Sequence, residues 1–198
     1  MINKNSRFLM LAMAFIAGCS VHENLIYSAV EINGEPVSKW PFSNYGVQLH
    51  IRADNTQAIH STSRVMGIPI QTVEGAHVAS IRPHTIFIAI KAKPTEVVAW
   101  EPAQLVLFHN NMEVRLSEIS YPKLIAYDAD CMEVSGTPAG AVAIHDEYYL
   151  CVKAVFDVDT IAPTENFQLK LSGLFVNGKP LTPMLINFKG SERKLVLM

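Results

Sequence analysis

The sequence has few charged residues and no excess of basic ones. Of its 198 residues only 17% are charged, and 16 Lys and Arg stand against 18 Asp and Glu, which gives a formal charge of −2. Because nucleic-acid binding needs a dense basic surface, this composition argues against a nucleic-acid partner. Hydrophobic residues make up 49% of the chain, which is enough for a packed core and excludes wholesale disorder.

Sequence motifs of the common enzyme classes are also missing. The chain has no Gly-x-Ser-x-Gly, no His-Glu-x-x-His, no phosphate-binding loop and no dinucleotide-binding fingerprint. We therefore expect neither an enzyme nor a cofactor. A hydrolase whose serine, histidine and acid meet only in the fold is an alternative, with Ser61, Ser63 or Ser135 as the nucleophile.

The apolar run Phe8–Ala17 is too short to cross a membrane. As a helix its ten residues would rise about 15 Å, half the roughly 30 Å of a bilayer core. The run follows Lys4 and Arg7 and ends in small residues, a pattern typical of a secretory signal peptide. We predict that residues 1–18 are removed from the mature chain.

The residues Ile16-Ala17-Gly18-Cys19 resemble the lipobox of bacterial lipoproteins. In that family an aliphatic residue and two small residues precede a cysteine that receives a diacylglyceryl group and becomes the mature N-terminus. The resemblance implies that Cys19 carries acyl chains, palmitate among them, and that these chains hold the protein to a membrane. By the sorting rule of such lipoproteins, Ser20 implies the outer membrane, facing the periplasm.

These segments predict the organisation of the chain. We expect a signal peptide over 1–18, a lipidated tether over 19–24 and a β-sandwich domain over 25–198. Removal of the signal peptide takes away Lys4 and Arg7 and no acid, so the formal charge falls from −2 to −4.

Cysteine is scarce, with three residues in all. With Cys19 assigned to lipid, Cys131 and Cys151 remain, and an even remainder in an exported chain favours a disulfide between them. Two buried thiols that never meet are the alternative. A redox pair would normally show a Cys-x-x-Cys spacing, which is absent.

Alternation of apolar and polar residues dominates the body of the chain. It is clearest in four segments, 47–52, 85–91, 150–158 and 167–172, and is typical of half-buried strands. The pairs Asn33-Gly34 and Asn177-Gly178 are strong hairpin signals. Short spacings between strands leave no room for crossover helices, so we predict an all-β antiparallel sandwich, immunoglobulin-like or related, with a barrel as the alternative. Only 55–66 also fits a helix, so at most one short helix is expected.

Metal sites have little support in the sequence. His109 and Met112 flank Asn110-Asn111 and could form a soft copper pair, although a hairpin tip explains the same residues. Two Asp-x-Asp triplets, Asp128-Ala129-Asp130 and Asp157-Val158-Asp159, could bind calcium, but solvated strand ends are the simpler interpretation. We therefore predict no metal.

Aromatic residues outside the core could form a contact surface. The candidates are Trp40-Pro41-Phe42, Phe87 and Tyr148-Tyr149. Together with the lipid on Cys19 they favour a non-enzymatic binding or assembly module that meets an envelope protein. A periplasmic carrier of a small ligand or of copper is the alternative, and it would need a pocket with converging polar groups.

Overall fold

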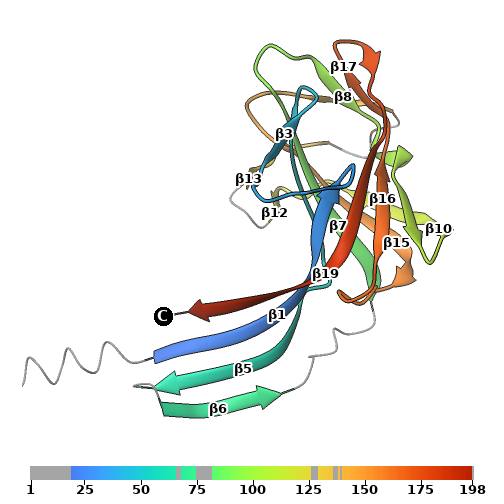
Figure 1. The fold of residues 1–198 in the computed structure, drawn as a ribbon. Coiled ribbons are helices and arrows are strands. Elements are labelled where there is room, and N and C mark those ends of the chain that lie inside the picture. The colour runs from blue at the N-terminus through green and yellow to red at the C-terminus, as the bar shows by residue number, and fades with distance from the viewer. Residues whose placement is uncertain are drawn as a thin grey trace, which may run out of the picture. The chain divides into compact units, whose positions relative to one another are not determined.

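The computed structural model describes residues 19–65, 68–74, 82–125, 129–135, 138 and 140–197 (Figure 1). Almost all regular structure in these residues is β-strand, and the helical part is a single 3-10 turn, η1 (Pro102–Gln104). The antiparallel all-β prediction is therefore confirmed. Within these residues, no helix has the length and apolar character needed to cross a membrane. The predicted signal peptide over 1–18 lies outside the described residues.

The chain forms two compact units. The larger one, the sandwich unit, contains the described residues within 28–55 and 79–191, and the smaller unit contains those within 19–27, 56–78 and 192–197. Strands β1 (Cys19–Ile32) and β19 (Met184–Leu197) each begin in one unit and end in the other.

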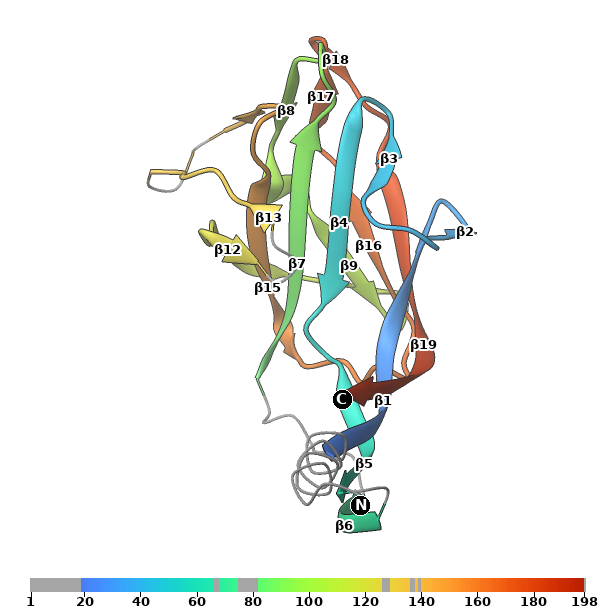
Figure 2. The same ribbon diagram turned by 90° about the vertical axis from the view of Figure 1, so that its left-hand side faces the viewer.

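Two large antiparallel sheets form the main part of the sandwich unit (Figure 2). In the first sheet the order is β10 (Met112–Val114), β9 (Val106–His109), β16 (Phe167–Leu171), β19 and β1, and β2 (Glu35–Pro36) also pairs with β1. In the second sheet the order is β11 (Leu116–Ser120), β15 (Leu150–Asp159), β7 (Pro83–Ala92), β4 (Val47–Ala53) and β3 (Phe42–Asn44).

Two smaller sheets complete the described strands. One has the order β14 (Val142–Ile144), β8 (Val98–Trp100), β17 (Leu174–Val176) and β18 (Lys179–Pro180). The other pairs β12 (Leu124–Ile125) with β13 (Ala129–Asp130). Trp100 of β8 is fully buried, and its indole Nε1 donates to the carbonyl of Ser172 at 2.9 Å. Gly173 follows with φ of +76°, where a Cβ would lie 2.9 Å from the carbonyl oxygen of Glu101, so this turn requires glycine.

The core lies between the two large sheets. Every second residue of β4 is buried, and so is every second residue of β16. The fully buried side chains come from both sheets, among them Leu49, Ile88, Leu107, Leu169, Ile186 and Phe188. Each large apolar side chain buried in this way contributes roughly 1.5–3 kcal/mol. The alternation in the sequence therefore reflects one face packed inward and one face turned outward.

The hairpin turns follow the sequence signals. Asn33-Gly34 joins β1 to β2, and Asn177-Gly178 joins β17 to β18. All four residues have positive φ, between 51° and 87°, which is the conformation that Asn and Gly tolerate best. Asn110 and Asn111, with φ of 52° and 60°, form the tip between β9 and β10. The hairpin interpretation of all three pairs is confirmed.

The smaller unit contains the first part of β1 with β5 (Gln57–Val65) and β6 (Ile68–Glu74). Residues Cys19 to Ile26 pair antiparallel with residues Val65 to Gln57. The helical alternative for 55–66 is thus wrong over 57–65. There β5 pairs with β1 on one side and with β6 on the other, and this pairing satisfies the backbone N–H and C=O groups of the extended chain. Residues 19–24, predicted as a tether, belong to β1.

The predicted disulfide between Cys131 and Cys151 is confirmed, with an S–S distance of 2.00 Å and a Cα–Cα distance of 5.5 Å. Cys151 is buried in β15 beside Ala89. Cys131 follows β13 and forms an isolated bridge with Tyr149. The disulfide therefore fastens the segment after β13 to the second sheet.

A buried polar cluster closes one end of the sandwich unit around Ile161. The Asn55 side chain donates to the Ser28 hydroxyl at 2.9 Å and to the Ile161 carbonyl at 3.1 Å. The Ile161 amide donates to Nδ1 of His84 at 3.3 Å, and the His84 ring packs edge-on against Phe167. Nε2 of His84 has no hydrogen-bond partner in the described structure. Burial, reinforced by the charge of His109, lowers the pKa of His84 to about 4.

Reduction of the disulfide should lower the free energy of unfolding. The bridge closes a loop with a sequence separation of 20, and a loop of that size contributes about 3 kcal/mol in the chain-entropy model. Denaturant unfolding with and without a thiol reductant measures the loss. The double variant Cys131→Ala, Cys151→Ala should not respond to the reductant. An unfolding midpoint of the natural chain that the reductant leaves unchanged would contradict the prediction.

His84 should make the fold less stable as the pH falls from 7 to 4. In this range His84 is protonated in the unfolded chain, where its pKa has the ordinary value of 6.5. It stays neutral in the folded chain, because its pKa in the fold is about 4. The two pKa values correspond to roughly 3 kcal/mol of stability that is present above pH 6.5 and lost by about pH 4. His84→Gln should flatten the stability profile by about that amount in urea unfolding. Parallel profiles for the variant and the natural chain would refute this.

Candidate functional site

The structure does not assemble a catalytic triad within the described residues. The Ser61 hydroxyl lies 3.5 Å from Oε1 of Glu23, while Ser63 and Ser135 make no hydrogen bond to a histidine in the described part of the chain. One serine does meet a histidine: Oγ of Ser20 lies 3.2 Å from Nε2 of His22 on β1. In the residues described, however, no acid binds His22, so a base-orienting partner for it is missing.

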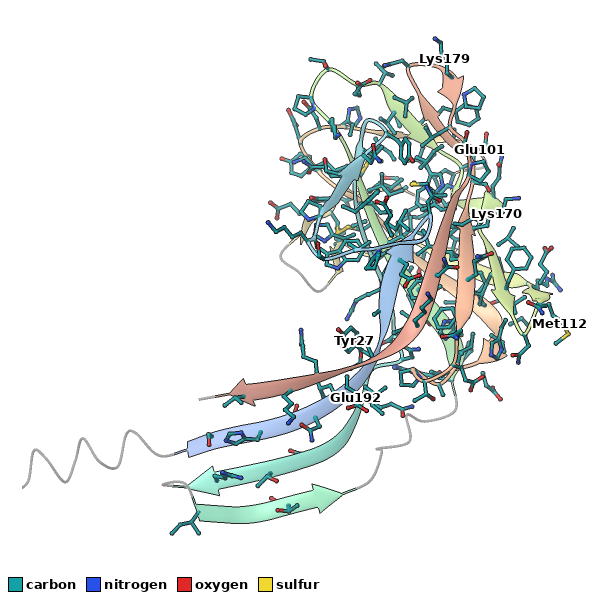
Figure 3. The ribbon with its side chains drawn as sticks, in the orientation of Figure 1. Tyr27, Glu101, Met112, Lys170, Lys179 and Glu192 are labelled. Carbon is teal, nitrogen blue, oxygen red and sulfur yellow. A yellow bond between two sulfur atoms is a disulfide. The ribbon has the colours of Figure 1, made fainter. Side chains whose placement is uncertain are left out.

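The copper candidates lie opposite each other on one hairpin. His109 of β9 pairs with Met112 of β10 across the turn. Nε2 of His109 lies 2.8 Å from Oε2 of Glu165. Met112 is 67% exposed, and its side chain points away from the sandwich (Figure 3). Among the described residues, no group of three His, Cys, Asp or Glu could hold a metal ion.

The other predicted site residues are dispersed. Asp130 lies in β13 and Asp128 lies outside the described residues, whereas Asp157 and Asp159 line a shallow pocket beside Ser117 at β15. Cys19, the predicted lipid attachment site, is the first residue of β1. The calcium interpretation thus gains no third acidic ligand in the described structure.

Two of the aromatic candidates, Trp40 and Tyr149, come together with His50 on the outward side of the second sheet. The Trp40 ring stacks on His50 of β4, with centroids 5.9 Å apart, and His50 meets Tyr149 edge-on at 5.4 Å. The Tyr149 hydroxyl donates to Oε1 of Gln48 at 3.4 Å. Trp40 is 39% exposed and the other two rings are half-buried, so the three rings form a continuous accessible surface.

Phe87 and cationic side chains continue this surface. The register places Arg52 of β4 and Lys153 of β15 on either side of Phe87 in β7, and directly opposed residues share one face of a sheet. The Arg52 guanidinium carbon lies 4.8 Å from the centre of the Phe87 ring, and Nζ of Lys91 lies 5.6 Å from the centre of the Tyr149 ring. Such cation–aromatic contacts hold both partners in place.

We call this surface the aromatic face and define it by Trp40, His50, Arg52, Phe87, Lys91, Tyr149 and Lys153. Partial burial lowers the pKa of His50 and raises the pKa of Tyr149, so both rings are uncharged at neutral pH. Of the remaining candidates, Phe42 packs against the core and Tyr148 is 49% exposed. The face can bind a partner that offers apolar and acidic groups.

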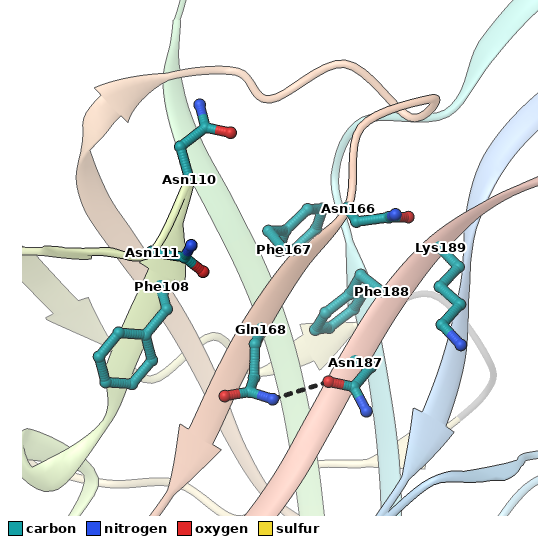
Figure 4. Close-up of a pocket in the computed structure, with 9 residues that line it drawn as sticks. All are labelled: Phe108, Asn110, Asn111, Asn166, Phe167, Gln168, Asn187, Phe188 and Lys189. Carbon is teal, nitrogen blue, oxygen red and sulfur yellow. Dashed lines mark hydrogen bonds between the residues drawn. The ribbon is translucent and has the colours of Figure 1, made fainter.

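A second outward surface was not foreseen from the sequence. A groove with a volume of about 400 Å³ lies on the first sheet (Figure 4). Five side-chain amides line it, from Asn110, Asn111, Asn166, Gln168 and Asn187. We call it the amide groove. Phe108, Gln168 and Asn187 are direct cross-strand neighbours on β9, β16 and β19, so their side chains stand in one row.

Two amides of the groove hydrogen-bond to each other, and two stacked phenylalanines pack beneath it. Nε2 of Gln168 donates to Oδ1 of Asn187 at 2.8 Å. Phe167 and Phe188, both buried, stack with their centroids 4.5 Å apart and also line the groove. Sequence reasoning recognised only Asn110-Asn111, as a turn. The other amides belong to segments more than fifty residues further along the chain. The sequence offered one signal for them, which is an amide at an outward position of both β16 and β19.

Comparison with protein-family models, with curated proteins and with solved structures gives no match.

Proposed function

We propose that the protein is a lipid-anchored binding module of the bacterial envelope. In this proposal it is attached through Cys19 to the outer membrane, faces the periplasm, and uses the aromatic face to dock an envelope protein without catalysis. The observation that carries the proposal is the stack of Trp40, His50 and Tyr149 on a sheet face that also bears cationic side chains.

The chemistry of the aromatic face supports a protein partner. Exposed aromatic rings and arginine are the side chains most enriched at the energetic centres of protein interfaces. Arg52 and Lys153 give this face a positive character, although the mature chain would have a net charge of −4. A partner with acidic and apolar side chains fits this surface, and the binding rate should fall as salt increases.

The start of the first strand supports the tethering part of the proposal. β1 begins at Cys19, so no loop of free chain separates the proposed lipid from folded structure. A domain held in this way stays in a thin layer next to the bilayer, where its effective concentration toward neighbours in the same membrane is high.

Lipid attachment should be visible in the mass of the mature protein. Intact-mass measurement of the chain purified from membranes should give a polypeptide that begins at Cys19 and carries added acyl mass. Cys19→Ala should remove the added mass and leave the uncleaved precursor. A mature chain that begins at Cys19 without added mass would disprove the anchor and leave the docking proposal standing.

Docking through the aromatic face should be visible by cross-linking in intact cells. A photoreactive residue at Trp40 should capture one specific envelope protein, and the same residue at Val97, which is 72% exposed and outside the aromatic face, should not. Tyr149→Ala should reduce the yield at Trp40 by about tenfold, as expected for loss of a central aromatic contact. Equal capture from both positions, or none from Trp40, would contradict the proposal.

A further inference from the structure

We infer that the amide groove binds a neutral oligosaccharide, with side-chain amides pairing with its hydroxyl groups and the Phe108 ring packing on an apolar sugar face. This inference goes beyond the proposed function and does not rest on it. The amide groove is on the first sheet, and the aromatic face is on the second.

The composition of the groove selects a ligand rich in hydroxyl groups. Each Asn or Gln side chain offers two donors and one acceptor oxygen, and a sugar hydroxyl likewise donates and accepts. Adjacent amides such as Gln168 and Asn187 can therefore bind neighbouring hydroxyls on one ring. An apolar ligand would leave these amides without partners, which is costly on burial.

The charge of the groove disfavours an ionic ligand. Lys189 is the one charged residue among those described that line it. Its Nζ lies 2.7 Å from Oε2 of Glu31, so the cation is already paired. An acidic ligand would have to compete with Glu31, and a cationic ligand would find no carboxylate in the lining. A neutral polar ligand meets neither obstacle.

The position of the groove disfavours a peptide added as a strand. Strand addition needs an open sheet edge with unpaired backbone groups. β16 lies under the middle of the groove and is paired with β9 on one side and with β19 on the other. A ligand here is recognised by side chains alone, which suits a sugar better than an extended peptide.

The groove is organised before any ligand arrives. The Gln168 and Asn187 amides hold each other at 2.8 Å, and the stacked rings of Phe167 and Phe188 fix the two strands beneath them. Preorganised side chains lose less conformational entropy on binding. The Phe108 ring, half-buried beside Gln168, offers the flat apolar surface on which the C–H face of a sugar ring can pack.

Titration of the mature protein with three neutral tetrasaccharides tests the inference. Maltotetraose, cellotetraose and chitotetraose differ in linkage and in their acetamido groups. The protein is purified from membranes in a detergent without a sugar headgroup, and the side-chain amide signals are followed by NMR. At least one sugar should shift the Asn and Gln signals of the groove with a Kd near or below about 1 mM.

Variants identify the site. Gln168→Ala and Phe108→Leu should each weaken binding by about tenfold. Lys170→Ala is the matched control, because Lys170 lies on β16 (Figure 3), two residues from Gln168 and outside the groove lining; it should bind as the natural chain does. Thermal melting establishes that each variant is folded. No shift with any sugar at about ten times that concentration, or binding that Gln168→Ala leaves unchanged, overturns the inference.

Discussion

The burial of alternate side chains between two sheets is the constraint on which the structure depends. In β4 and β16 every second residue is apolar and enclosed, and this packing supplies most of the favourable free energy of such a fold. Inward positions cannot change without leaving a cavity or a strained core. Outward positions carry no such restriction, and they hold aromatic rings on one sheet and side-chain amides on the other.

The same constraint explains how much of the fold the sequence could predict. Alternation of apolar and polar residues is a local signal, and it predicted β4, β7, β15 and β16. The Asn-Gly pairs, also local, predicted the turns at Asn33-Gly34 and Asn177-Gly178. β5 was ambiguous because the spacing of its apolar residues also fits a helix. Its strand conformation is set by pairing with β1 and β6. The residues within β5 itself carry no pattern that indicates this pairing.

Prediction of the candidate sites would have needed the register between paired strands, which a single sequence does not provide. Trp40, Phe87 and Tyr149 could each be singled out as aromatic candidates, but their grouping with Arg52 and Lys153 follows from pairing across three strands. The amide groove was not predicted from the sequence, because Gln168 and Asn187 become neighbours only through the register between β16 and β19. Single amides in strands are unremarkable until their neighbours are known.

The disulfide between Cys131 and Cys151 also helps to position one ring of the aromatic face. Tyr149 exchanges backbone hydrogen bonds with Asp130 and Met132, on either side of Cys131. While the thiols are reduced, only non-covalent contacts hold the segment beside the ring, among them these hydrogen bonds and the packing of Met132 and Val134 against the core. Oxidation fastens this segment covalently to β15, so the position of the Tyr149 ring in the aromatic face depends on the redox state of the two cysteines.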